Sequence, residues 1–154
     1  SGISKKKENT MKPTDNPDQI EKLTQHLVEF YERFSSWEQG VVKETDITLP
    51  QMHALEILGS SGQLRMKEFA EKLGITTGAL TVLVDKLVRC GLVTRVPNEQ
   101  DRRSIMVRLT AEGEKIFQEH HHHHNQLSFD LVNSLEPDEA EIFLMILKKI
   151  NTVL

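Results

Sequence analysis

The spacing of apolar residues changes from a helical period to a period of two within residues 66–109, and this change constrains the fold more than any other feature. The first part of the segment carries an apolar stripe with the i, i+3, i+4, i+7 spacing of one helix face. The stripe consists of Met66, Phe69, Ala70 and Leu73. Gly74 follows where helices commonly end in a left-handed cap, and Thr76 or Thr77 can cap a second helix that ends before Gly91. Two short helices joined by a turn of about three residues that contains glycine are typical of a helix-turn-helix.

After Gly91 the side-chain pattern takes a period of two in the runs 92–96 and 105–109. This period predicts two strands, and the polar segment between them, which begins at Pro97, predicts a turn. A β-hairpin with a charged tip directly after a helix-turn-helix is a wing. Residues 48–110 are therefore predicted to form a winged helix-turn-helix.

Long amphipathic helices are predicted on both sides of this unit. Apolar residues recur at helical spacing from Ile20 to Phe34, Thr110 caps a helix that reaches about Ser134, and Pro137 opens a last helix. The expected fold class is mainly α with a small β-hairpin wing.

The flanking helices, residues 18–47 and 111–154, carry apolar stripes that one small domain cannot easily cover. They are predicted to form a helical dimerisation region. The interface is expected to include Phe143, Leu144 and Leu147. Residues 1–17 have no apolar periodicity and are expected to be disordered, with Ser1 and Gly2 as the remnant of a tag; residues 18–154 fit one domain.

Charge is distributed unevenly along the chain. Residues 62–110 contain nine Lys and Arg against five Asp and Glu, a net charge of +4, whereas the whole chain has −4. A basic region in an acidic frame is expected of a local phosphate-binding face. Unevenness of an ordinary protein surface is the alternative explanation.

Other features exclude several classes of protein. No apolar run approaches the ~20 residues of a membrane span, so no membrane partner is expected. Cys90 is the only cysteine, which suits a reducing cytoplasm. The chain has no nucleophile elbow, phosphate loop or paired catalytic carboxylates, and position 121, where a metalloprotease would need glutamate, is histidine. We therefore expect no enzyme activity.

The wing carries a family motif. Residues 101–104 read Asp-Arg-Arg-Ser, and residues 107–113 read Val-Arg-Leu-Thr-Ala-Glu-Gly. This resembles the D-x-R-S…L-T-x-x-G motif of the MarR family of bacterial regulators, and the predicted helix order matches that family. The resemblance implies a homodimeric transcriptional regulator, expected to be a repressor, that binds a pseudo-palindromic double-stranded DNA operator.

Candidate DNA-binding residues lie on the second helix of the helix-turn-helix and on the wing. On the helix they are Thr76, Thr77, Gly78, Thr81, Lys86 and Arg89, and on the wing Arg95, Asp101, Arg102 and Arg103. The helix residues, with Asp85 on the same polar face, would meet base edges and phosphates in the major groove. Arg103 resembles the minor-groove arginine of the family, oriented by Asp101, while Arg95 and Arg102 are expected to contact phosphates. The alternatives are a solvated helix face and an Asp101–Arg103 salt bridge that stiffens the hairpin.

Five consecutive histidines, residues 120–124, lie within the predicted fifth helix. Ile116, His120, His124 and Leu127 share one helix face, which places two imidazoles inward on adjacent turns, whereas the intervening His121 and His122 face away. Two histidines with i, i+4 spacing can share one metal ion.

With His53, this pair resembles the metal site of zinc-responsive MarR regulators that repress zinc uptake. The resemblance implies zinc bound by His53, His120 and His124, with a glutamate from the first helix; Glu32 and Glu38 are both candidates. The alternative is a MarR-type regulator that senses a small aromatic or lipophilic ligand, in which the histidine run has no function.

Overall fold

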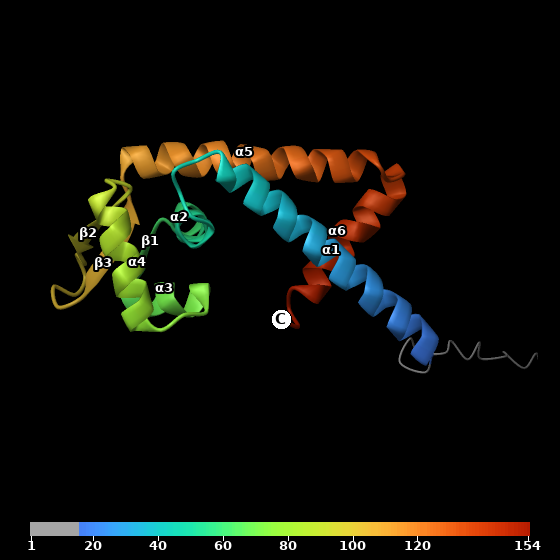
Figure 1. The fold of residues 1–154 in the computed structure, drawn as a ribbon. Helices are drawn as coiled ribbons and strands as arrows, with labels where there is room; N and C mark the ends of the chain where they lie inside the picture. The colour runs from blue at the N-terminus through green and yellow to red at the C-terminus, as the bar shows by residue number, and fades with distance from the viewer. Residues whose placement is uncertain (1–15) are drawn as a thin grey trace, which may run out of the picture. The chain divides into compact units, whose positions relative to one another are not determined.

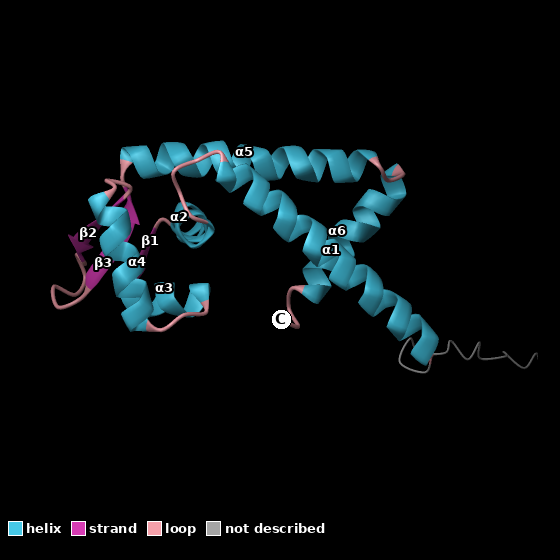
Figure 2. Ribbon diagram, in the orientation of Figure 1, coloured by secondary structure: helices cyan, strands magenta, loops and turns pink. Residues whose placement is uncertain are grey.

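The computed structural model describes residues 16–154, which form six helices and three strands (Figures 1 and 2). The elements are α1 (Pro17–Lys43), α2 (Leu49–Ser61), β1 (Gln63–Arg65), α3 (Met66–Leu73), α4 (Thr77–Arg89), β2 (Val93–Pro97), β3 (Ile105–Leu109), α5 (Ala111–Asn133) and α6 (Pro137–Ile150). The mainly α fold class with a β-hairpin wing is confirmed. The expected disordered segment 1–17 lies outside the described residues except for Asn16 and Pro17, and Pro17 already begins α1.

The described chain divides after Gly40 into two compact units. In the first unit, α1 leaves much of its predicted apolar stripe exposed, including Ile20, Leu23 and Leu27. None of the helices among residues 16–154 is long and apolar enough to cross a membrane.

The second unit contains an antiparallel sheet with the strand order β1-β3-β2. β2 and β3 form the predicted wing, with Val93 opposite Leu109 and Pro97 opposite Ile105. β1 was not predicted; it pairs Leu64 with Val107 and so ties the chain before the helix-turn-helix to the wing. A strand of three residues is too short to establish a period of two in the sequence.

One apolar core joins α2, the helix-turn-helix and the sheet. Its fully buried members are Ala54, Leu55, Leu58, Phe69, Leu80, Val84, Leu87 and Val107. The caps between α3 and α4 form as predicted: Gly74 takes the left-handed conformation at φ 67°, and the Thr76 side chain accepts a hydrogen bond from the Ala79 amide at 3.1 Å. The core and these caps fix α4 in place, with Leu80, Val84 and Leu87 buried and the opposite face of the helix exposed.

The Leu-Thr-x-x-Gly part of the motif joins the wing to α5. The Thr110 hydroxyl donates to the Gly91 carbonyl at 2.6 Å and accepts from the Gly113 amide at 3.1 Å, while the Thr110 amide donates to the Leu92 carbonyl at 3.0 Å. Gly113 lies against the same segment, because a Cβ added there would come within 2.0 Å of the Leu92 oxygen. The start of α5 is thus fixed to the chain that leads from α4 into the wing.

Of the described residues on α6, none is buried. The predicted interface residues Phe143, Leu144 and Leu147 are 37%, 55% and 38% exposed in the single chain. A helix with this much exposed apolar surface is uncommon in a protein that works as a monomer.

Candidate DNA-binding surface and metal centre

The N-terminal half of α4 exposes small and hydroxyl side chains. Thr77, Gly78 and Thr81 are all exposed, and the Thr81 hydroxyl donates to the Thr77 carbonyl at 2.9 Å. A Cβ added to Gly78 would lie 4.0 Å from the Thr76 hydroxyl, so the fold does not require glycine at this position. Thr76 caps the helix, and its hydroxyl is therefore engaged at the start of the surface.

The C-terminal half of α4 carries the cations Lys86 and Arg89, which are both exposed. Arg95 on β2 forms a salt bridge with Asp85 on α4. This pair links α4 to the wing, so a phosphate contact of Arg95 would have to share its guanidinium with Asp85. The contribution of such a partly exposed pair to stability is expected to be below ~1 kcal/mol.

The wing tip, residues 98–104, is built by its own polar side chains. The Asp101 carboxylate accepts from the Arg103 amide at 3.1 Å, and the Asp101 carbonyl accepts from both the amide (3.0 Å) and the hydroxyl (3.1 Å) of Ser104. Asp101 therefore orients Arg103 through the backbone. The side chains of Arg102 and Arg103 are exposed at the tip.

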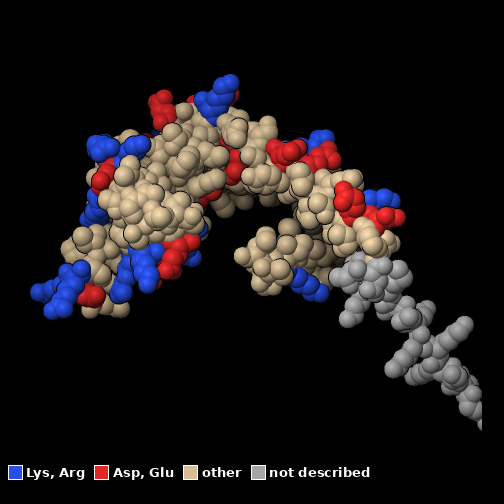
Figure 3. Space-filling view, turned by 60° about the horizontal axis from the view of Figure 1, so that its bottom comes forward, with Lys and Arg blue, Asp and Glu red and all other residues tan. Residues whose placement is uncertain are grey.

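All nine cations of residues 62–110 are exposed. They are Arg65, Lys67, Lys72, Lys86, Arg89, Arg95, Arg102, Arg103 and Arg108. Figure 3 shows several Lys and Arg side chains gathered on one part of the surface. A locally positive surface of this kind attracts the DNA backbone although the net charge of the chain is negative.

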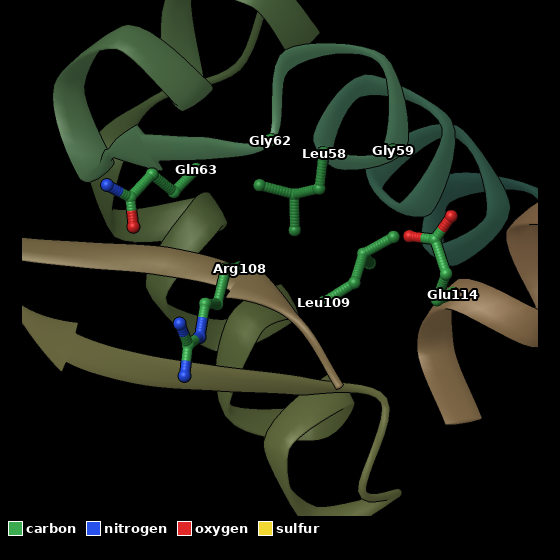
Figure 4. Close-up of a pocket in the computed structure, with 7 residues that line it drawn as sticks. All are labelled: Leu58, Gly59, Gly62, Gln63, Arg108, Leu109 and Glu114. Atoms are coloured by element: carbon green, nitrogen blue, oxygen red, sulfur yellow. The ribbon is translucent and has the colours of Figure 1, made fainter. Parts of the chain in front are cut away.

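A pocket of about 330 Å³ lies between the end of α2, β1, β3 and the start of α5. In Figure 4, Leu58 and Leu109 face each other across it, with Gln63 and Arg108 to one side and Glu114 to the other. Its size lies at the lower end of the range for small-molecule sites. With charged groups of both signs around two leucines, it suits a polar compound better than a lipophilic one.

The histidine pair lies where α2 crosses α5. A Cβ on Gly59 would come within 2.5 Å of the Phe117 ring, so glycine permits the two helices to pack closely. One turn earlier on α2 is Glu56, and one turn later on α5 is His120, which is only 2% exposed. The close crossing therefore brings a carboxylate and an imidazole together in the second unit.

Three donor atoms converge at this crossing. Glu56 Oε1 lies 2.7 Å from His120 Nε2 and 2.9 Å from His124 Nε2, and the two Nε2 atoms are 3.0 Å apart. The side chains of Glu56 and His124 are 27% and 25% exposed. The cluster is thus closed on the side of His120 and reachable from solvent on the side of the other two.

Burial lowers the pKa of His120 from its ordinary 6.5 to about 4, and the imidazoles of His124, His123, His53 and His121 add to the lowering. His120 is therefore neutral at pH 7, which is the form that a metal ion requires.

The donor set fits a divalent transition metal such as zinc. Ligand atoms about 2 Å from a tetrahedral zinc ion lie about 3.3 Å from one another, a few tenths of an ångström more than the distances between these three atoms. One feature opposes binding: His120 Nδ1 is buried and has no hydrogen-bond partner among the described residues. When Nε2 binds a metal the ring proton lies on Nδ1, where the missing acceptor costs about 1–3 kcal/mol.

Known proteins share the winged helix-turn-helix of this chain. The MarR family model matches residues 47–105, from just before α2 to the start of β3. The multiple antibiotic resistance protein MarR of Salmonella typhimurium is 34% identical over 106 residues, which are 68% of this chain and 74% of that protein. The chain belongs to the MarR family. It is accordingly a transcriptional regulator and not an enzyme.

Solved MarR-type structures share the fold over almost their whole length. A MarR family protein from Bacillus stearothermophilus is 26% identical with a TM-score of 0.81, covering 89% of this chain and 96% of that one. FabT of Streptococcus pneumoniae, solved in complex with DNA, is 21% identical with a TM-score of 0.79, covering 87% of this chain and 96% of its own. At 21% identity, the similarity to FabT shows only that the two proteins share a fold.

The structure of this MarR-family chain brings together two of the predicted metal ligands, His120 and His124. His53 lies on α2 one turn before Glu56, and its role as a ligand stays a prediction. Glu32 and Glu38 lie on α1 in the first unit, so their part in the site also stays a prediction.

Glu56 was missed by the sequence reasoning. Its position three residues after His53 places both on one face of α2, and this spacing could have identified Glu56 as a candidate.

Proposed function

We propose that this MarR-family regulator binds operator DNA as a homodimer and represses transcription, and that zinc held by the histidine pair controls its DNA binding. The observation that carries the DNA-binding part is the exposed face of α4, where a glycine that the fold does not need lies beside exposed hydroxyls. Close approach of backbone to a duplex is the use that explains such a surface.

The wing completes the DNA-binding surface. The backbone contacts of Asp101 hold Arg102 and Arg103 outward, at a tip that can enter the minor groove beside the major groove read by α4. The remaining exposed cations of the winged unit are available for phosphates. FabT, whose fold is similar, binds DNA, which supports this arrangement.

The exposed apolar side chains of α6, together with the exposed stripe of α1, support dimerisation. In a dimer with twofold symmetry the same helices of both chains cover one another. The two copies of α4 would then reach successive major grooves, with half-sites about one helical turn apart.

The regulatory part rests on the convergence of two imidazole nitrogens 3.0 Å apart in a position where His120 stays neutral. A metal at this point lies between α5, which leads to α6, and α2, which belongs to the core of the winged unit (Figure 1). Its binding can therefore fix the angle between the dimerisation helices and the winged helix-turn-helix.

Selection of bound duplexes from a random DNA library, with zinc and with a chelator in parallel, tests the proposal. We expect an inverted repeat to be enriched, and its affinity for the protein to differ between the two conditions. The matched variants are His120→Ala/His124→Ala, which should lose the zinc effect, and His121→Ala/His122→Ala, which should retain it. No enrichment in either condition would refute DNA recognition. Enrichment that is unaffected by chelation would refute the zinc effect and favour the small-molecule alternative.

A further inference from the structure

We propose that Val82 on α4 reads the C5-methyl group of a thymine in the major groove and so determines one base pair of each half-site. The inference rests on the proposed binding of operator DNA and names one residue that makes this binding specific.

Val82 is an apolar side chain on the polar face of α4. It is 56% exposed, and among the described residues 49–109 no other large apolar side chain is exposed to this extent. A single exposed apolar residue is normal on a protein surface and by itself indicates nothing. Its position on the helix and its neighbours are what give Val82 a role.

Helix geometry places Val82 at the centre of the exposed face. The buried residues Leu80, Val84 and Leu87 mark the side of α4 that packs on the core. Because an α-helix turns by about 100° per residue, Val82 lies roughly opposite the middle of this buried side. Gly78, one turn earlier on the same face, has no side chain that would keep a base edge away. A duplex that receives this face therefore meets Val82 with its base edges.

The polar side chains next to Val82 are already engaged within the protein. The Thr81 hydroxyl donates to the Thr77 carbonyl at 2.9 Å, and the Asp85 carboxylate accepts from the Arg95 guanidinium. If Thr81 donated to a base, or if Asp85 left Arg95 to accept from one, a hydrogen bond of the protein would break. An apolar contact of Val82 breaks none.

Thymine carries the group that complements an isopropyl side chain. It is the one base with a methyl group on its major-groove edge, whereas the other edges present mainly donors and acceptors. Valine against such a polar edge would displace water from it without replacing the hydrogen bond, which costs free energy. Val82 therefore favours thymine and disfavours the other bases at the same position.

The charge around Val82 fits DNA as the partner. Lys86 lies one turn later on the same face and Arg89 about two turns later, and both are exposed. These cations attract phosphates on either side of the groove. The apolar contact of Val82 adds the preference for a base that such charge contacts do not provide.

Fluorescence anisotropy with the full chain and duplexes of the selected operator tests this assignment. In each duplex, one thymine of a half-site and its symmetry mate are replaced by deoxyuridine, which removes only the methyl group. At one thymine position we expect the wild type to lose affinity about fourfold for each half-site substituted. Val82→Ala should bind the thymine and deoxyuridine duplexes at that position within about twofold of each other.

The matched control is Val88→Ala, the same change on the same helix. Val88 is 37% exposed and lies nearer the buried side of α4, so this variant should keep the loss that deoxyuridine causes in the wild type. Thermal melting checks that both variants fold.

The outcomes separate this inference from the proposed function. If no duplex is bound specifically, operator recognition itself fails. If the operator is bound but no thymine shows a loss, or if Val82→Ala keeps the loss, DNA binding stands and the role of Val82 is wrong. Equal effects of Val82→Ala and Val88→Ala would also overturn it, as would a Val82-dependent effect seen only when a cytosine of the operator is replaced by 5-methylcytosine.

Discussion

Gly113 at the start of α5 packs against the carbonyl of Leu92 so closely that a Cβ would come within 2.0 Å of the oxygen. Within a helix, alanine is normally more favourable than glycine by up to about 1 kcal/mol. Here the clash is with backbone, which cannot move without disturbing the hydrogen bonds of Thr110. We expect Gly113→Ala to lower the free energy of unfolding by about 2–3 kcal/mol in chemical denaturation.

The control for this prediction is Gly40→Ala. Gly40 lies within α1, and a Cβ there would meet no atom of the described residues within 4 Å. The same substitution should leave stability unchanged or raise it. A loss at Gly40 as large as that at Gly113 would contradict the steric explanation.

Gly78→Ala should separate DNA binding from folding. The fold has space for the methyl group, so the melting temperature should stay the same or rise. At a DNA interface the added methyl group would hold α4 away from the duplex, and we expect affinity for the selected operator to fall about tenfold, or ~1.4 kcal/mol. Fluorescence anisotropy measures the affinity; an unchanged value would place Gly78 outside the interface.

Arg103→Ala should weaken operator binding strongly and leave the fold intact, because the tip is held by the Arg103 amide and not by its exposed guanidinium. If the guanidinium neutralises phosphate charge in the groove, the slope of log affinity against log salt should fall by up to about 0.9. Anisotropy titrations at several salt concentrations measure both effects. Equal affinities of Arg103→Ala and wild type would remove the wing from the mechanism.

Leu147→Glu should convert a dimer into monomer or insoluble protein. Leu147 lies on α6 among apolar side chains that stay exposed in the single chain, and a carboxylate in a covered interface would be desolvated without a partner. Sedimentation velocity at micromolar concentration gives the mass, with Glu141→Gln as a control on the same helix. A monomeric wild-type protein would contradict the proposed assembly.

Stability should depend on pH through His120. Its pKa is about 4 in the folded chain and ordinarily 6.5, so the unfolded chain takes up a proton over this interval before the folded chain does. The contribution of His120 to stability is therefore full above about pH 6.5 and is lost as the pH falls towards 4. Between these limits, the free energy of unfolding of the wild type should therefore rise with pH more steeply than that of His120→Gln. The difference in slope should be up to about 1.4 kcal/mol per pH unit, which corresponds to one proton, and denaturation curves at several pH values measure it. Parallel slopes for the two proteins would show that His120 is not desolvated.

The winged unit could be predicted from sequence because its elements are specified locally. The period of apolar residues, the left-handed Gly74 and the Thr76 cap each fix a helix or its end without reference to distant parts of the chain. β1 escaped prediction because its identity comes from pairing with β3, a contact between residues more than forty positions apart.

The candidate metal site was predictable only on α5, where His120 and His124 are neighbours through helical spacing alone. Glu56 depends on how α2 crosses α5, and that crossing is decided by Gly59 and Phe117, which carry no metal chemistry. The pairing of Arg95 with Asp85 was hidden for the same reason, since the wing and α4 are separate in sequence.

The single core beneath α4 and the wing has a mechanical consequence. Leu80, Val84 and Leu87 of α4 pack in the same cluster as Val93 and Val107 of the sheet, and the Asp85–Arg95 bridge spans the same two elements at the surface. α4 and the wing therefore form one rigid body, and the distance between them is set when the chain folds. In the proposed dimer, an effector that moves the helices outside this core would change the distance between the two rigid units, and with it the spacer length between half-sites that the dimer accepts.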